Sequence, residues 1–287
     1  MCGCNGVFTV ELPEKAASRP AKPREAVLKR RLQGFWNAHQ PYWDALTEDI
    51  SADSPNRSKA ASYIPEGSRV LDAACGSAAN AFWLAPKCRY FGADISQSGL
   101  RRASRPGLRL ACGDGDQLPF ANASFDAAIS TFALEHAVNP VHMLEELHRV
   151  VRPGGRIVLL GPSWDLPFWY PNSVRSKAQN PVWRLAYTTR RMAGQLGGWL
   201  LGALPFLIVE DPDVFHSEFI NDADAVYVVW SYEVIRQMKR WGCRLVHCEV
   251  DDRMLGSHWA VRLFKHMLFL LPPFRYAGST VLMVFER

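Results

Sequence analysis

Short apolar runs and helical stretches alternate through the middle of the chain, between Arg69 and Pro162. The apolar runs cover residues 69–74, 89–93, 108–112, 125–130 and 156–160, and the helical stretches cover 78–85, 96–104 and 141–151. Parallel strands need long crossover connections, usually helices, so this alternation predicts a parallel sheet covered on both faces. Right-handed crossovers place the carboxyl ends of the strands along one edge, where a ligand would bind.

The sequence after residue 162 follows a different pattern. Residues 163–225 are dense in Trp, Pro, Tyr and Arg, and they are long enough to form a cap over the ligand edge. A helical stretch at 232–241 and strand-like runs at 244–250 and 280–285 then resume the alternation. We therefore predict a Rossmann-like, doubly wound α/β fold, with a mostly parallel seven-stranded sheet and a helical, aromatic cap inserted after the fifth strand.

The first 32 residues are predicted to form a basic, flexible lead-in, because they are rich in Ala, Pro, Lys and Arg. Seven basic and three acidic side chains in residues 1–31 supply +4 of the formal net charge of +5. Residues 33–287 would then form one domain. Its expected parts are a core at 66–162, the cap at 163–225, and a C-terminal helix and strands at 226–287.

Composition narrows the class of protein. Hydrophobic residues make up 48% of the chain and charged residues 21%, which is typical of a globular protein and not of a disordered one. The longest apolar stretch, residues 199–209, is too short to span a bilayer, and the N-terminus does not look like a secretory signal. The seven cysteines, an odd number, are expected to be reduced thiols. We expect a cytoplasmic protein, with peripheral contact to an anionic membrane left open.

The turns after the first three predicted strands carry the pattern that points to chemistry. The first strand runs into the sequence DAACGSA at residues 72–78, where small residues let the backbone approach a ligand. The second strand ends at Asp94, where an acid binds ribose hydroxyls in dinucleotide folds. The third strand is followed by GDGDQLPF at residues 113–120. Together these turns predict a nucleotide-like ligand at the edge of the sheet.

On these motifs the chain resembles the class I S-adenosylmethionine-dependent methyltransferases, in the branch that modifies small molecules, lipids and quinones. The resemblance is strong over about residues 66–162 and loose over 225–287. It implies S-adenosyl-L-methionine as cofactor and transfer of its methyl group to a small, hydrophobic or lipid-like acceptor. The missing G-x-G-x-x-G pattern argues against a nicotinamide cofactor. The oligomeric state is left open.

The resemblance implies roles for residues at the carboxyl ends of the first four strands. These are Asp72, Ala74 and Gly76 for the methionine moiety, Asp94 and Ile95 for the ribose, Asp114, Gly115 and Leu118 for the adenine, and Thr131 and Phe132 beside the methionine. Two glycines of the family pattern D-x-G-x-G-x-G are replaced by Ala74 and Ala78. Alanine is expected only where the backbone angle is ordinary, so these replacements predict a narrower turn.

Two histidines are candidates for a general base, which oxygen, nitrogen or acidic carbon acceptors use in methyl transfer. His136 follows the fourth strand at the predicted ligand edge, although a Glu-His pair there also fits a role in shaping the pocket. His216, near the end of the predicted cap, is the second candidate. The cap itself either holds an apolar acceptor, lies on a membrane, or completes the core.

Two other functions compete with methyl transfer to a small molecule. The first is a non-catalytic module that binds the cofactor and holds a partner protein through its aromatic cap. The second is a nucleic-acid methyltransferase, which only the basic tail favours, so no nucleic-acid partner is expected. No metal is expected either, because Cys2 and Cys4 make half a zinc site, and His142 and His148 do not share a helix face.

Overall fold

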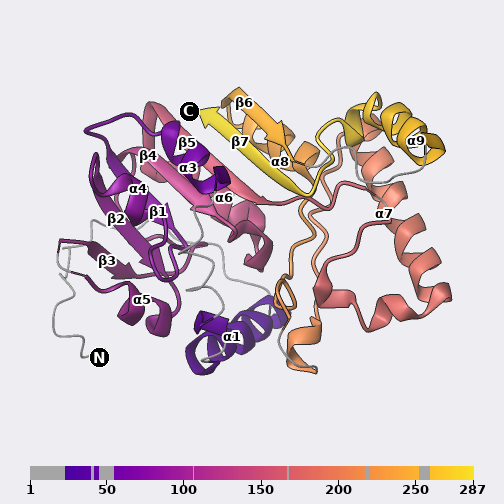
Figure 1. Cartoon of the computed structure of the whole chain (residues 1–287), viewed down its shortest axis with the longest axis horizontal. Helices are drawn as coiled ribbons and strands as arrows, with labels where there is room; N and C mark the ends of the chain where they lie inside the picture. Colours follow the sequence, from indigo (N-terminus) through magenta and orange to yellow (C-terminus); the bar gives the residue numbers. More distant parts are fainter. Residues whose placement is uncertain are drawn as a thin grey trace. The chain divides into compact units, whose positions relative to one another are not determined.

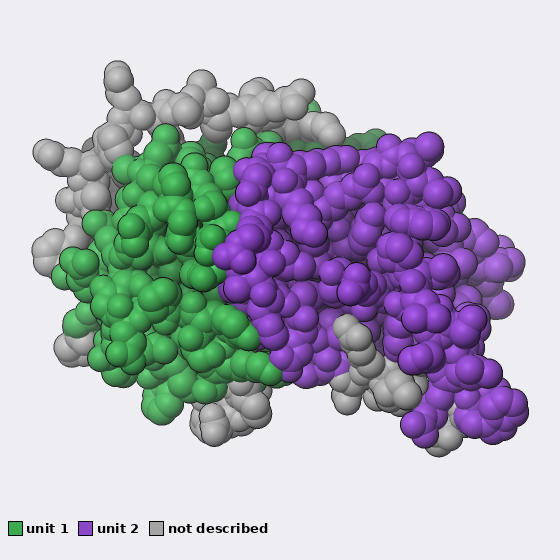
Figure 2. Space-filling model, turned by 90° about the horizontal axis from the view of Figure 1, so that it is seen from above, with its two compact units in different colours: residues 1–133, 139–159, 286–287 green, residues 134–138, 160–285 purple. Residues whose placement is uncertain are grey.

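The computed structural model describes residues 23–39, 42–44, 55–105, 107–166, 168–216, 220–251 and 259–287. Most of the predicted lead-in, residues 1–22, therefore lies outside the described residues, as do Cys2 and Cys4. The chain divides into two compact units, which Figure 2 colours separately. Unit 1 consists of residues 1–133, 139–159 and 286–287, and unit 2 consists of residues 134–138 and 160–285.

Seven strands form a sheet in the order β3-β2-β1-β4-β5-β7-β6 (Figure 1). The strands are β1 (Arg69–Ala73), β2 (Arg89–Asp94), β3 (Arg109–Cys112), β4 (Phe125–Thr131), β5 (Val151–Pro162), β6 (Arg244–Val250) and β7 (Thr280–Glu286). β1 pairs in parallel with both β2 and β4, and β2 pairs in parallel with β3. The predicted Rossmann-like sheet is confirmed, and β1, which lies between β2 and β4, is buried from Val70 to Ala73.

The crossover helices of unit 1 are α4 (Ala81–Leu84), α5 (Gln97–Ala103) and α6 (Pro140–Val150). The Asn139 side chain caps α6 by accepting from the His142 backbone N–H, and Pro140 stands at the first turn, where its missing N–H costs nothing. α6 then buries an apolar stripe against the sheet, of which Leu144 and Leu147 are fully buried. α4 is shorter than the predicted stretch 78–85, because the chain is still turning as far as Asn80.

The segment that precedes the sheet contains helices as well. Helix α1 covers Pro23–Ala38, so the last ten residues of the predicted flexible lead-in are helical in the structure. Leu28 and Leu32 are buried on one face of α1, which contacts α5. The composition of this segment is rich in charged residues, so the pair Leu28 and Leu32, spaced by about one helical turn, does not stand out as a sign of a helix. A second helix, α3 (Pro55–Ser62), precedes β1.

Unit 2 contains the segment predicted to be a cap. Residues 163–225 form short 3-10 helices and one long helix, α7 (Pro181–Leu201), which begins at the Asn180 side-chain cap and ends at Gly202 with φ +77°. After this segment come α8 (Ser231–Arg240), α9 (Trp259–Phe269) and the 3-10 helix η5 (Pro272–Phe274). α8, β6 and β7 match the predicted final helix and strands within a residue or two. That residues 163–225 cover the ligand edge stays a prediction.

Candidate functional site

Four strands of unit 1 end with a polar side chain at or next to their carboxyl end. Asp72 lies near the end of β1, Asp94 ends β2, Asp114 follows β3 and Thr131 ends β4. Because these strands are neighbours and parallel, their carboxyl ends lie at one edge of the sheet. The structure therefore brings together the cofactor-binding positions that the sequence predicted, within a single unit.

The turn after β1 is built from left-handed residues. Ala74, Gly76 and Ala78 have φ angles of +57°, +54° and +60°. The expectation that alanine stands there because the backbone angle is ordinary is wrong. A left-handed conformation costs an alanine about 1 kcal/mol, so the surrounding hydrogen bonds must hold the turn in place. Cys75 supplies one of them, since its N–H donates to Ala93 O at 3.0 Å.

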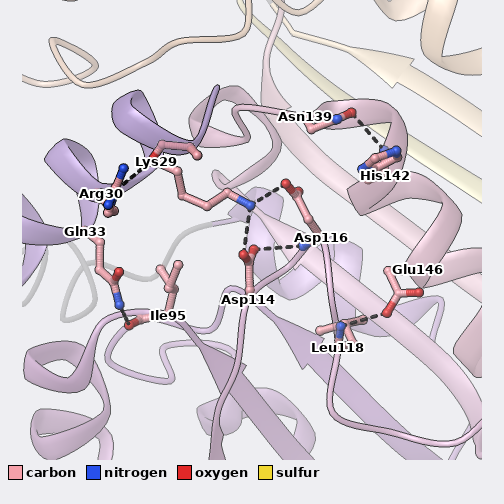
Figure 3. A network of polar contacts seen from close by, with 11 residues as sticks. Lys29, Arg30, Gln33, Ile95, Asp114, Asp116, Leu118, Asn139, His142 and Glu146 are labelled. Atoms are coloured by element: carbon pink, nitrogen blue, oxygen red, sulfur yellow. Dashed lines mark hydrogen bonds and ion pairs between the residues drawn. The ribbon is translucent and has the colours of Figure 1, made fainter. Parts of the chain in front are cut away.

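Asp94 holds the first two turns together. Its Oδ2 accepts from the Gly76 N–H at 2.8 Å, and its Oδ1 accepts from the Ser96 N–H at 2.7 Å. The residue is 8% exposed. A carboxylate oxygen can accept more than one hydrogen bond, and Asp94 is the acid that the resemblance assigns to ribose hydroxyls. Next to it, half-buried Ile95 accepts from the Gln33 side chain of α1 through its carbonyl at 3.4 Å (Figure 3).

Asp72 is the centre of a buried hydrogen-bond network. Its Oδ2 accepts from the Tyr90 hydroxyl at 2.6 Å, and its Oδ1 accepts from the Asn80 amide at 3.0 Å. Burial raises the pKa of Asp72 to about 6, and the two hydrogen bonds oppose that rise. The same Asn80 amide donates to Thr131 Oγ1, which also accepts from Arg57 at 2.6 Å. Asp72 and Thr131, predicted beside the methionine moiety, are thus linked by one network.

Phe132, immediately after β4, adopts an uncommon backbone conformation. Its φ is +51°, which is rare for a bulky side chain, and the Arg57 guanidinium lies 5.0 Å from the centre of its ring. Strained residues of this kind cluster at functional sites, because the surroundings must compensate for the cost. Sequence analysis did not single out Arg57, which lies in α3 before the recognised motifs, nor Asn80 or Tyr90.

An ion pair from α1 occupies the end of β3. Lys29 Nζ lies 2.8 Å from Asp114 Oδ2 and 2.5 Å from Asp116 Oδ2, between the two carboxylates (Figure 3). Burial lowers the pKa of Lys29, but the two carboxylates outweigh it and the net shift is upward. Burial raises the pKa of Asp116 to about 6, although Lys29 opposes that shift. The predicted adenine acceptor Asp114 is therefore already hydrogen-bonded from α1.

The loop after β3 is held from α6. The Leu118 N–H donates to Glu146 Oε2 at 2.7 Å, and Arg149 bonds both Glu146 and the Leu118 carbonyl. Leu118 is 1% exposed, so its side chain is part of the core in this structure. A Cβ atom at Gly115 would lie at ordinary van der Waals distance from the Met143 side chain of α6. Glu146 and Arg149 of α6 therefore hold this loop in place.

Both candidate bases lie in unit 2. His136 is mostly buried, and its Nδ1 lies 3.3 Å from Asp224 Oδ2 while its Nε2 lies 3.9 Å from Glu135 Oε1. Burial lowers the pKa of His136, but Asp224 and Glu135 outweigh it and raise the pKa above its ordinary value. His216 is different, since its side chain is 56% exposed and pairs with Asp211 at 2.8 Å. Only His136 combines burial with a carboxylate partner.

Glu135, the neighbour of His136, is fully buried. Among the described residues, neither of its carboxylate oxygens has a hydrogen-bond partner. Burial raises the pKa of Glu135 to about 7, with His136 opposing the shift. Its backbone is fixed nonetheless, because the Glu135 carbonyl accepts from the Val226 and Tyr227 N–H groups at 2.8 Å. The sequence pattern had suggested Glu135 only as the partner of a histidine.

Residues 71–159 match the family model of a methyltransferase domain. Over 101 residues the chain is 42% identical to the demethylmenaquinone methyltransferase of Mycobacterium sp. strain KMS, which covers 35% of this chain and 44% of that protein. It is 33% identical over 140 residues to phthiotriol/phenolphthiotriol dimycocerosates methyltransferase 1 of Mycobacterium ulcerans strain Agy99, covering 43% and 51%. The chain thus spans about half the length of the curated relatives it matches.

A solved structure extends the likeness to the rest of the fold. The geranyl diphosphate C-methyltransferase of Streptomyces coelicolor A3(2) aligns with 93% of this chain and 100% of its own, with a TM-score of 0.53 and 14% identity. At that identity the likeness concerns the fold alone. The matched family region begins within β1 and ends within β5, so it contains all four strand ends described above.

Proposed function

We propose that this chain, which carries an S-adenosylmethionine-dependent methyltransferase domain of the Rossmann-like class, transfers a methyl group from that cofactor to a small, hydrophobic or lipid-like acceptor. The observation that carries the proposal is that the family match coincides with the strand ends where Asp72, Asp94 and Asp114 lie. The names of the relatives, which act on a quinone precursor and on phthiotriol-type compounds, support the lipid-like class of acceptor.

The residues at the strand ends fit this cofactor chemically. Asp94 is a buried carboxylate at the end of β2, a group that accepts from ribose hydroxyls, and Asp114 can accept from the adenine amino group once it shares or releases Lys29. The left-handed residues Ala74 and Gly76 end the extended backbone of β1 in a tight turn. A tight turn of small residues lets a ligand approach the backbone closely. Asp72, which the resemblance places beside the methionine moiety, is held in position by its hydrogen bond from Asn80.

When bound, the cofactor supplies an electrophilic methyl group on its sulfonium, and the reactivity is its own. The chain contributes by binding, by orientation and by exclusion of water, and alignment alone supplies several kcal/mol. A general base completes the machinery where the acceptor carries a proton. We propose His136 for this role and keep His216 as the second candidate, because a buried carboxylate, that of Asp224, lies 3.3 Å from the His136 ring.

The pH dependence of turnover tests this assignment. His136 must be neutral to accept a proton, and the neighbouring carboxylates Asp224, Glu135 and Asp222 raise its pKa against burial. We expect kcat to rise with pH through a pKa above 6.5, and His136→Ala to lower kcat about a hundredfold or more. Demethylmenaquinone and related lipid extracts are the acceptors to use, with His216→Ala as the matched variant. Loss of kcat only in His216→Ala would transfer the role to that histidine.

The two competing functions give different results in the same assay. A cofactor-binding module without turnover would bind S-adenosylhomocysteine but methylate none of the acceptors, and would form a stable complex with a partner protein. A nucleic-acid methyltransferase would show salt-sensitive binding to DNA or RNA. Methyl transfer to a lipid extract, lost on removal of His136, is the result that the proposal predicts.

A further inference from the structure

Helix α7 of unit 2 has its polar and apolar faces reversed. Its buried residues are Thr188, Arg191, Gln195 and Gly198. Besides Leu201 at its C-terminal end, its exposed large hydrophobic side chains are Val182 at 74%, Leu185 at 68%, Leu196 at 37% and Leu200 at 67%. The spacing of these four residues, by three, eleven and four, keeps them on one helix face. A helix that covers only its own core would show the opposite arrangement.

Hydrogen bonds fix α7 in this orientation. The Arg191 guanidinium donates to the Trp169 carbonyl at 2.7 Å, and the Gln195 amide donates to the Asp165 carbonyl at 2.9 Å. Thr188 Oγ1 lies 2.5 Å from the Tyr170 hydroxyl. Rotation of α7 to bury its leucines would break all three interactions. It would also place the leucine side chains against the polar groups that now form these hydrogen bonds. The apolar face is therefore turned outward by the packing of unit 2 itself.

Helix α9 of the same unit is also apolar and exposed. Trp259 is 71% exposed, Leu263 55% and Met267 58%, and these residues follow one another at a spacing of four along one face. Phe264 and, in the turn after the helix, Leu270 extend this surface with exposures of 57% and 67%. Both α7 and α9 contact η5, so the two exposed helices belong to the same part of unit 2 (Figure 1).

The charges on these helices are all of one sign. α7 contains Arg184, Arg190 and Arg191 and α9 contains Arg262 and Lys265, whereas neither helix contains an aspartate or glutamate. Arg184, Arg190 and Arg262 are exposed. An apolar face with cations beside it and no anions is complementary to the negatively charged surface of a phospholipid bilayer. Two copies of such a surface would repel each other, which disfavours self-association through it.

We propose that the exposed faces of α7 and α9 dock this protein on the surface of an anionic phospholipid bilayer. Among the described residues, no helix is both long and apolar enough to cross a membrane, so the helices would lie in the plane of the interface. The apolar side chains would enter the acyl boundary while the arginines remain at the headgroups. This inference stands independently of the proposed methyl transfer, and it would give the chain access to lipid-like acceptors.

Binding of the full chain to vesicles tests the proposal. We expect co-sedimentation with vesicles of phosphatidylcholine and phosphatidylglycerol, and binding weaker by about fivefold or more to phosphatidylcholine alone or in high salt. Leu185→Ser/Leu200→Ser in α7 and Leu263→Ser/Phe264→Ser in α9 should each weaken binding by about tenfold or more. The matched control is Phe82→Ser in α4, because Phe82 is 70% exposed but lies in unit 1. This variant should bind the anionic vesicles as the wild type does.

Each other outcome counts against the proposal. Wild-type protein that does not bind the anionic vesicles would overturn it, as would a Phe82→Ser variant that loses as much binding as the two double variants. Light scattering that shows a dimer, converted to monomer by Leu263→Ser/Phe264→Ser, would assign the surface to a second copy instead. Affinity for S-adenosylhomocysteine, measured on the same variants, should not change. If the methyl-transfer proposal alone is wrong, the wild-type protein will not bind S-adenosylhomocysteine but will still bind the vesicles.

Discussion

Both units bury carboxyl groups that are hydrogen-bonded, as Asp165 and Glu233 are in unit 2, but unit 2 also buries Glu135. In unit 1, Asp72 and Asp94 each accept hydrogen bonds on both oxygens, from neighbouring turns and strands. In unit 2, the Glu135 carboxylate has no hydrogen-bond partner among the described residues, although it is fully buried. A buried polar group without a partner is costly, whereas a satisfied one contributes to a fixed geometry. Unit 1 therefore holds its buried carboxylates in a fixed geometry, and unit 2 holds a carboxyl group whose protonated form is favoured by burial.

Among the substitutions that test this comparison, we expect the largest loss of stability at Asp72. Asp72→Ala removes the acceptor of both the Tyr90 hydroxyl and the Asn80 amide and leaves these donors buried. We expect the free energy of unfolding to fall by about 3 kcal/mol. Chemical denaturation measures it, with the exposed Glu145→Ala as control. A loss no larger than that of the control would mean that the network does not stabilise unit 1.

A smaller effect of opposite sign is expected at Glu135. The pKa of Glu135 is about 7 in the folded protein against an ordinary 4.5, so the unfolded chain releases this proton first as the pH rises. The contribution of Glu135 to stability therefore falls between pH 4.5 and 7 and stays low above. We expect Glu135→Gln to equal the wild type near pH 4.5 and to exceed it by up to about 2 kcal/mol at pH 8.

Denaturation curves of both proteins across this pH range measure the difference. A Glu135→Gln variant that is less stable than wild type at pH 8 would show that the carboxylate is satisfied in the ionised state. The contrast between the two units would then disappear.

The smallest effect concerns the left-handed turn. Ala74→Gly and Ala78→Gly each relieve a strained φ, but glycine also gains freedom in the unfolded chain. We expect each substitution to raise the free energy of unfolding by up to about 1 kcal/mol. Ala128→Gly in the middle of β4, where the backbone is extended and buried, serves as the control and should destabilise. If the turn variants lost as much stability as the control, the packing of the alanine methyl groups would outweigh the strain of the left-handed backbone.

Much of unit 1 was predictable, because its signals are local. The Ser96 cap of α5, the apolar stripe of α6 and the acids at the strand ends all depend on residues close in sequence. The contacts that complete the site are not local, since Lys29 reaches Asp114 across 85 positions and Arg57 reaches Thr131 across 74. No sequence spacing marks such pairs.

The orientation of α7 shows a second limit. Leucines on one face of a helix are ordinarily buried, but the leucine face of α7 is exposed. The actual orientation depends on distant partners, such as the Trp169 carbonyl for Arg191 and the Asp165 carbonyl for Gln195. The left-handed alanines show the same limit. Alanine favours an ordinary backbone angle, whereas the left-handed angle depends on hydrogen bonds to residues such as Asp94.

Calorimetric titration with S-adenosylhomocysteine, on the wild type and on Asp94→Ala, tests the central claim most directly. Asp94 is the acid that joins the first two turns and that we propose binds the ribose. We predict micromolar binding to the wild type, no binding of NAD, and an affinity at least about tenfold lower in a folded Asp94→Ala variant. Absence of binding to the folded wild type, or equal affinity in Asp94→Ala, would contradict the account.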